Sequence, residues 1–400
     1  MQTDRRKFIA GLAAGSFGVN ILNAEPTKQA PAKNVILIAL DGGMSHIDSF
    51  DPKKDKEVAG NTTAIPTTGD FSIGNRLPKL AQVMHHAAVI RSMTSKTGAH
   101  RGAQYLNRTS YTQRATITHP SLGSWVSFLS NRDVTIPDFV LVSGASSHPG
   151  SGFLPKIKSP LPIVDPNSGL RNSSADSKLV ERMDLLRQVN AGIKSPLATQ
   201  YNDFYDNTVR FLKSKDLDLF DLSGESAQTR ERYGNTRLGS GLLLAKRLVK
   251  GDVRFIEVNN GGWDTHTENF EKLDNKLKEL DDAVSSLVLD LQSEGLLDST
   301  LVAIVTDFGR TPKINVNTGR DHYPQAYSTL LLGAGINGGV TVGETNEQAT
   351  KVIADPHSIT DVNATIAHLA GLDLERQHFS PTGRPFRVAD HGKPIAKALA

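Results

Sequence analysis

The feature that most constrains the fold is an alternation of two patterns along the chain. Apolar runs of about four to eight residues, rich in Val, Ile and Leu, alternate with longer segments of helical periodicity. Short and continuously apolar runs of this kind are typical of strands that are buried on both faces. The strands predicted in this way are residues 35–40, 88–91, 139–142, 253–258, 301–306 and 328–332.

The clearest helical pattern spans residues 269–292, where Leu and Val side chains recur at intervals of three and four and Gly295 follows as a stop signal. Residues 242–248 are predicted to be the end of a second helix, and residues 358–370 are predicted to form a third. Strands that alternate with helices predict a mostly parallel sheet covered by helices on both faces. The stretch 144–174 is dense in Ser, Pro and Gly, and we expect it to form a long surface loop over the sheet.

Composition excludes several classes of protein. With 38% hydrophobic and 22% charged residues, the chain has the balance of an ordinary globular protein. Its net charge is only +3 and the signs are mixed, which argues against a nucleic-acid partner. There is no cysteine, so disulfides, iron–sulfur clusters, thiolate zinc sites and cysteine nucleophiles are excluded. A metal ion would have to be bound by His, Asp or Glu.

The amino-terminal segment is typical of an export signal. The pair Arg5 and Arg6 precedes a weakly apolar segment, rich in Gly and Ala, that extends to Leu22. This order is typical of a twin-arginine signal, and the segment is too short and too rich in glycine for a membrane span. We expect residues 1–30 to be signal and linker and residues 31–400 to form one domain. The mature protein would then lie in the periplasm or outside the cell, without a membrane span.

Polar side chains gather where the predicted strands end. The carboxyl ends of parallel strands meet at one edge of a sheet, which is where such sheets bind their ligands. Carboxylates that share an edge repel one another, and a divalent cation is the simplest way to neutralise them. The side chains that follow these strands, or precede the next one, are Asp41, Asp264, His266, Asp307 and His322.

Each of these residues also has a structural interpretation. Asp41 precedes Gly-Gly and could form a turn. Asp264 and His266 could cap the helix that follows them, and His322 could be a loop residue beside its acidic neighbour. Their joint placement at one edge favours a metal site. Weaker candidates for ligands are His46 and Asp48.

Four motifs carry a family resemblance. They are DGGMSHIDSFDPK at 41–53, GGWDTH at 261–266, DFGRTP at 307–312 and GRDHYP at 319–324. Together they resemble the exported family known as domain of unknown function 1501 and, more loosely, the alkaline phosphatase-like superfamily of phosphatases, nucleotide pyrophosphatases and sulfatases. This resemblance implies a three-layer α/β sandwich and the hydrolysis of phosphate or sulfate esters. It also implies one or two divalent cations, with zinc as the first choice and manganese or calcium as alternatives.

The resemblance implies metal-binding roles for particular residues. Asp41 and Asp307 match the carboxylates that hold one cation in the superfamily. Asp264, His266 and His322 match the Asp and two His that hold the second.

The resemblance also implies a nucleophile. Residues 92–108 are similar to the sulfatase signature, in which Thr97 would take the position of the nucleophile, while Arg101 and Arg108 match its arginines. A metal-activated threonine and a bidentate arginine suit an anionic ester. Other hydroxyls close enough to be the nucleophile are Ser92, Thr94 and Ser95. The residues expected to contact substrate are His100, Arg310 and Arg320, although the last two could instead neutralise the acids.

Two departures from the superfamily pattern keep a second function open. Phe308 stands where the superfamily has a histidine ligand, and Asp264 and His266 are two rather than four residues apart. The first hypothesis is an exported metal-dependent hydrolase that acts on an anionic ester, such as a polysaccharide or another component of the cell envelope. The second is a noncatalytic module that keeps the fold and binds glycans or envelope proteins.

Overall fold

The strand β1 (Asn34–Leu40) lies inside the central sheet and pairs in parallel with β7 (Phe255–Asn260) and β8 (Thr300–Thr306). The computed structural model describes residues 31–400 except 131, 133, 145–146, 171–176, 192 and 194–195. The twin-arginine segment therefore lies outside the described residues. None of the described helices is long and apolar enough to span a membrane.

Over the described residues, the central sheet has nine strands in the order β12-β4-β11-β8-β1-β7-β5-β6, with β15 paired to β4. The pairing is parallel except where β11 runs antiparallel to β4 and β8. The remaining strands of this sheet are β4 (Ala87–Thr94), β5 (Phe139–Val142), β6 (Leu161–Ile163), β11 (Tyr327–Gly333), β12 (Val340–Val342) and β15 (His357–Ser358).

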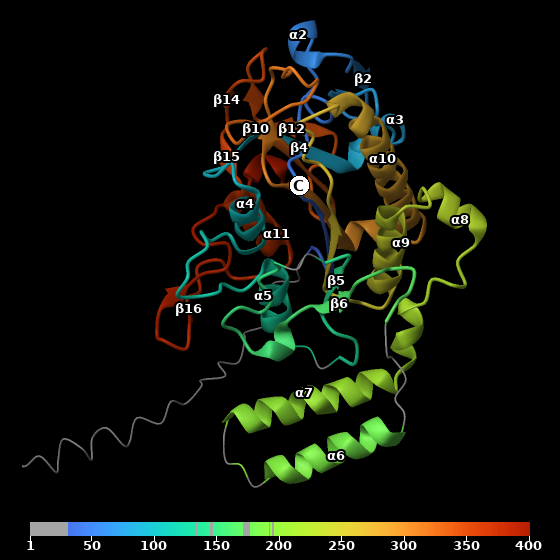
Figure 1. The fold of residues 1–400 in the computed structure, drawn as a ribbon, viewed down its shortest axis with the longest axis vertical. Helices are drawn as coiled ribbons and strands as arrows, with labels where there is room; N and C mark the ends of the chain where they lie inside the picture. Colours follow the sequence, from blue (N-terminus) through green and yellow to red (C-terminus); the bar gives the residue numbers. More distant parts are fainter. Residues whose placement is uncertain are drawn as a thin grey trace, which may run out of the picture.

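Helices cover both faces of this sheet (Figure 1). One layer consists of α4 (His100–Thr109), α5 (Leu122–Leu129) and α11 (Ile359–Leu369). The opposite layer consists of α3 (Pro78–Ala81), α9 (Arg237–Lys250) and α10 (Asn269–Ser293). The predicted α/β architecture, a mostly parallel sheet with helices on both faces, is confirmed.

Alternate side chains of β1 build two separate cores. Ile36, Ile38 and Leu40 belong to the core shared with α9 and α10. Val35 and Leu37 point the other way and belong to the core shared with α4, α5 and α11. A strand that is apolar at every position thus stabilises both interfaces, as expected for the interior of a parallel sheet.

Shorter elements lie around this framework. The remaining α-helices are α2 (Lys56–Ala59), α6 (Ser177–Ala191), α7 (Pro196–Leu212) and α8 (Ala227–Arg232). The 3-10 helices are η1 (Met84–His86), η2 (Lys156–Lys158), η3 (Lys215–Phe220), η4 (Leu297–Ser299) and η5 (Ala396–Ala398). The two-stranded pairs are β2 (Ala64–Pro66) with β3 (Ser72–Gly74), β9 (Gly309–Arg310) with β10 (His322–Tyr323), β13 (Glu344–Thr345) with β14 (Val352–Ala354), and β16 (His378–Phe379) with β17 (Pro385–Phe386).

One element differs from the sequence prediction. The stretch predicted as a loop contains β6, which pairs in parallel with β5 through Pro162. β6 is the last strand of the sheet, and an edge position tolerates a residue that has no N–H to donate. Residues 242–248, predicted as the end of a helix, do lie in the second half of α9, whose first turn is capped by the Thr236 hydroxyl, which accepts from the Gly239 N–H at 3.0 Å.

A buried ion pair ties the loop between β9 and β10 to the loop after β1. The side chains of Arg320 and Asp48 have no exposed surface, and Arg320 Nε lies 2.8 Å from Asp48 Oδ2. Asp48 also accepts hydrogen bonds from Ser45 Oγ, at 2.6 Å, and from Thr62 Oγ1, at 2.8 Å. This pair therefore holds together two loops that are 272 residues apart in the chain.

Replacing Asp48 by Ala should lower the free energy of unfolding by about 3–5 kcal/mol, because the Arg320 guanidinium would stay buried without its counter-charge. Urea unfolding followed by circular dichroism measures this change. The control is Asp355→Ala, which removes the exposed pair between Asp355 and Lys397 and should cost less than about 1 kcal/mol. Equal costs for the two variants would contradict the structural role of the buried pair.

Candidate active site

The candidate site lies at the carboxyl ends of β8, β1 and β7. Leu40 is in register with Thr306 on one side and Asn260 on the other, so Asp41, Asp307 and the loop after β7 begin at the same level of one sheet edge. Two further elements bring histidines to this edge. His100 is the first residue of α4, and His322 lies on β10, opposite Arg310 of β9.

Three imidazoles converge on one carboxylate oxygen. Asp264 Oδ1 lies 3.4 Å from His100 Nε2, 3.1 Å from His266 Nε2 and 3.3 Å from His322 Nε2. The ring centres of His100 and His322 are 4.3 Å apart, and those of His266 and His322 are 4.7 Å apart. Ligand atoms of His100, Asp264 and His322 all lie within 4.8 Å of one another. We call His100, Asp264, His266 and His322 the imidazole cluster.

The second ring nitrogen of each imidazole is held by an acceptor. His100 Nδ1 lies 2.8 Å from Asp307 Oδ2, and His266 Nδ1 lies 2.8 Å from Asp321 Oδ1. His322 Nδ1 lies 2.8 Å from the carbonyl oxygen of Gly98. Ionised carboxylates and carbonyls only accept, so Nδ1 carries the proton in all three rings. In the neutral ring, Nε2 is then an acceptor that faces another acceptor, Asp264 Oδ1, at 3.1–3.4 Å. A cation or a proton has to lie between such atoms, and metal-binding histidines are oriented in this way.

Two buried atoms at this edge have no hydrogen-bond partner among the described residues. They are His100 Nε2 and Asp307 Oδ1. The other oxygen of Asp307 is fully used, because it accepts from the Gly42 N–H at 2.9 Å and from Gln104 Nε2 at 3.2 Å as well as from His100. An unpaired buried polar atom costs about 1–3 kcal/mol, so both atoms call for a partner from outside the chain.

His100 occupies a different place from the one the sequence suggested. It was expected to contact substrate, but it is part of the imidazole cluster. Its ring stacks on Phe308, with centres 4.9 Å apart and planes at 26°. Because Phe308 follows Asp307, the end of β8 has no imidazole of its own. His100, the first residue of α4, supplies one that stacks on the Phe308 ring. The signal available in the sequence was a histidine at the start of a helix that follows a strand.

Asp41 does not join the cluster. Its Oδ2 lies 3.2 Å from Arg108 Nη2, while Arg108 Nε lies 2.7 Å from Glu257 Oε1. Burial raises the pKa of Asp41 in spite of the nearby Arg108. Burial would also raise the pKa of Glu257, but Arg108 and His148 outweigh it and hold this pKa at about 2. Arg108 therefore provides at Asp41 the positive charge that the sequence analysis assigned to a cation.

Sequence reasoning did not single out Glu257 and His148. Glu257 is buried within β7, and His148 Nε2 lies 3.1 Å from its Oε2. The available signal in the sequence was the acid Glu257 in the middle of an apolar strand, β7. This strand pairs with β1, which is followed by another acid, Asp41.

Arg310 and Arg320, which were expected to contact substrate, are buried. Arg310 Nη2 lies 2.5 Å from Asp264 Oδ1, and its Nε donates to the Gly43 carbonyl at 2.8 Å. Burial of Asp264 opposes its ionisation, but the hydrogen bond from Arg310 lowers the pKa of this carboxyl. Arg320 is engaged by Asp48. Both guanidiniums therefore fix loops and charges, as the alternative interpretation in the sequence analysis held.

The expected nucleophile borders the cluster. Thr97 is followed by Gly98, whose carbonyl holds His322, and Thr97 Oγ1 accepts from the Ala99 N–H at 3.1 Å. Arg101 is exposed in the first turn of α4. Of the alternative hydroxyls, Ser92 has no exposed surface and is therefore excluded from meeting a substrate.

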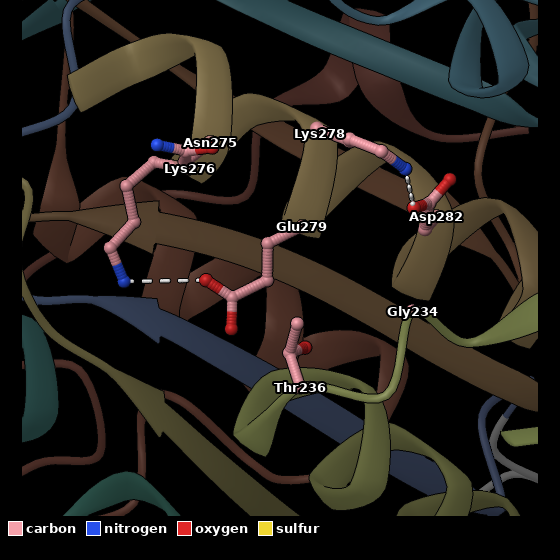
Figure 2. A pocket seen from close by; sticks show the side chains of 7 residues that line it. All are labelled: Gly234, Thr236, Asn275, Lys276, Lys278, Glu279 and Asp282. Atoms are coloured by element: carbon pink, nitrogen blue, oxygen red, sulfur yellow. Dashed lines mark hydrogen bonds and ion pairs between the residues drawn. The ribbon is translucent and has the colours of Figure 1, made fainter. Parts of the chain in front are cut away.

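The imidazole cluster is open to solvent. The side chain of Asp264 is 47% exposed, that of His266 43% and that of His322 30%. A separate hollow of about 270 Å³ lies between α10 and the loop that precedes α9 (Figure 2). Its charged side chains are paired with each other, Lys276 with Glu279 at 3.3 Å and Lys278 with Asp282 at 2.5 Å. The hollow therefore lacks the unpaired groups that mark the cluster.

Comparisons with solved structures give low similarities. The chain is similar to a mutant of alkaline phosphatase PafA (10% identity, TM-score 0.48, covering 94% of this chain and 100% of that one). It is also similar to a protein in the alkaline phosphatase superfamily from Vibrio parahaemolyticus (12%, 0.43, covering 100% and 80%) and to the PsFucS1 sulfatase from Pseudoalteromonas sp. (14%, 0.42, covering 92% and 73%). These TM-scores lie below 0.5, so they carry no conclusion about the chemistry of this chain.

A search of the curated proteins found no match. A search against protein-family models gives a match over residues 32–399, which is nearly all of the chain outside the amino-terminal segment. The family has the description "Protein of unknown function (DUF1501)", and the chain belongs to this family.

Proposed function

We propose that this protein is a metal-dependent hydrolase of phosphate or sulfate esters in which His100, Asp264 and His322 bind a divalent cation, with His266 as a further ligand. The observation that carries the proposal is the pattern of Nδ1 hydrogen bonds. Three separate acceptors orient three rings so that their Nε2 atoms face one point. A cluster of surface histidines has no reason to share this arrangement.

The residues of the imidazole cluster fit a bound metal ion better than they fit three protonated histidine rings. If the three rings were imidazolium ions, they and Arg310 would bring four positive charges against the three carboxylates of Asp264, Asp307 and Asp321. Like charges this close repel one another strongly in a partly buried site. Neutral rings around one cation avoid this repulsion and give the buried His100 Nε2 a partner.

The donor set indicates which metal. Imidazole nitrogens with one carboxylate suit zinc, and manganese is a weaker alternative. Calcium prefers oxygen ligands throughout, so nitrogen-rich ligation disfavours it. We propose one cation rather than two, because Arg108 already neutralises Asp41 and Glu257 at the neighbouring position.

A bound divalent cation would supply Lewis-acid activation of the ester. The chain itself provides the positioning. Asp307 fixes the ring of His100, and Arg310 keeps Asp264 ionised and directed. Thr97 is the proposed nucleophile, because its Oγ1 already accepts the Ala99 N–H and so keeps a defined rotamer. Arg101, in the first turn of α4, would bind the non-bridging oxygens of the ester.

The openness of the cluster favours a large substrate. A site whose ligands are between about a quarter and a half exposed admits a group attached to a polymer. We therefore propose a phosphate or sulfate ester on a polysaccharide or another envelope component. Export through the twin-arginine pathway would bring the enzyme to such a substrate.

The metal site predicts that protein purified without chelators contains close to one equivalent of a divalent cation, zinc first. His322→Ala should lower metal affinity by at least about 10-fold, since it removes a ligand. Elemental analysis and titration with a zinc-sensitive dye measure both quantities. The control is His391→Ala, which alters an exposed histidine near the carboxyl terminus. Metal-free protein, or equal affinities in the two variants, would contradict the site.

The residues that orient the rings should matter almost as much as the ligands. Asp321→Asn removes the carboxylate that holds His266 Nδ1 and should weaken metal binding by about 10–100-fold. Asp298→Asn changes an exposed acid elsewhere and serves as the matched control. If both variants bound zinc like the unaltered protein, His266 would not be a ligand.

Turnover tests the proposed chemistry. With zinc or manganese, the protein should hydrolyse at least one of an aryl phosphate, a phosphodiester and an aryl sulfate. Thr97→Ala should reduce kcat by at least about 100-fold while metal content stays unchanged, because the nucleophile is lost but the ligands remain. The control is Thr116→Ala, which removes an exposed hydroxyl of the loop after α4. Metal-loaded protein that hydrolyses none of these substrates would favour the noncatalytic binding module.

A further inference from the structure

The helices α6 and α7 form a hairpin that lies apart from the sheet and its covering helices (Figure 1). We call residues 177–212 the helical hairpin. Its two helices are tied by Asn190 Nδ2, which donates to Asn202 Oδ1 at 3.1 Å, and by Arg187 Nε, which donates to Asp206 Oδ1 at 2.6 Å. The hairpin joins the body of the protein where Phe211 packs against Phe220 of η3 with ring centres 5.8 Å apart.

Large apolar side chains of the hairpin are exposed. On α6, Leu185 is 60% and Val189 61% exposed, one helical turn apart. On α7, Tyr201 is 51% and Phe204 43% exposed, also one turn apart. Large apolar side chains that are exposed in a group on two neighbouring helices favour an interaction site in a soluble protein. Two helices alone leave these apolar side chains exposed to water, whereas four helices packed as a bundle can bury them.

We propose that the helical hairpin is a self-association surface, through which two copies of this chain pair about a twofold axis and form a four-helix bundle. Leu185 and Val189 of α6 and Tyr201 and Phe204 of α7 would lie in the interior of the bundle. A twofold pairing uses the same patch on both copies, so one surface suffices for a closed dimer.

The charge of the hairpin points to a second copy as the partner. The sequence between residues 177 and 212 contains five basic residues, Lys178, Arg182, Arg187, Lys194 and Arg210, and four acidic ones, Glu181, Asp184, Asp203 and Asp206. Acidic and basic residues thus nearly balance. A helix that binds an anionic membrane surface carries a clear excess of basic residues, and a strongly charged protein partner would require the opposite excess. A near-neutral surface suits a copy of itself.

The size of the hairpin also fits a dimer. Helices of 15 and 17 residues are about 22 and 25 Å long, and two of them side by side are about 20 Å wide. Such a face covers about 500 Å² in projection, and its solvent-accessible area is larger because side chains make it rough. A stable interface buries about 800 Å² on each partner, so the hairpin face approaches the area that a dimer needs.

Sedimentation equilibrium of the full chain tests the proposal. The unaltered protein should sediment as a dimer that dissociates on dilution, and L185E/V189E should weaken association at least about 100-fold, because each interface would bury charges. Tyr201→Ser with Phe204→Ser provides an independent disruption from α7. The matched control is Leu289→Glu, at an exposed leucine of α10 outside the hairpin, which should leave the dimer intact.

Unchanged circular dichroism and zinc content would show that the variants are folded. A monomeric unaltered protein would overturn the proposal, and so would a dimer that survives both double variants. Binding of the unaltered protein to phosphatidylglycerol vesicles without dimer formation would also overturn it, in favour of a membrane surface as the partner. Loss of the dimer in both hairpin variants, with retention in the control, is the result that the proposal predicts.

Discussion

The parallel pairing of β1 with β7 and β8 decides where the functional side chains of this protein lie. Three adjacent strands end at one level, and each is followed within a few residues by an acid. Acids brought together in this way must be compensated, because each loses hydration as the loops close around it. Which groups neutralise each acid therefore decides what chemistry this edge of the sheet can perform.

Buried guanidiniums neutralise most of these acids. Arg108 serves Asp41 and Glu257, Arg310 serves Asp264, and Arg320 serves Asp48. What remains is a set of three imidazoles with oriented protons, together with His100 Nε2 and Asp307 Oδ1, which are buried and have no hydrogen-bond partner in the described part of the chain. The acids are thus compensated in two ways. Arginines neutralise the acids of loops that must stay fixed, and imidazoles surround a centre that can accept an ion. This division is why we propose a single cation at the imidazole cluster.

The sequence was informative wherever local pattern determines structure. The helix α10 begins at the predicted residue and ends one residue beyond the prediction, because its apolar stripe is long and regular. Asp264, His266 and His322 do come together, since strand ends place them. The ion pairs of Asp41 with Arg108 and of Arg320 with Asp48 were not predicted, because the partners are distant in the chain and only the fold reveals the pairing. The hairpin helices were missed because much of their apolar surface faces solvent rather than a core.

The most direct test of the central claim is a crystal structure of the protein purified without chelators, with anomalous diffraction recorded at the zinc absorption edge. We predict one strong anomalous peak at about 2.0–2.2 Å from the Nε2 atoms of His100 and His322 and from a carboxylate oxygen of Asp264. A map without a peak at this position, or with the only strong peak beside Asp41, would contradict the account.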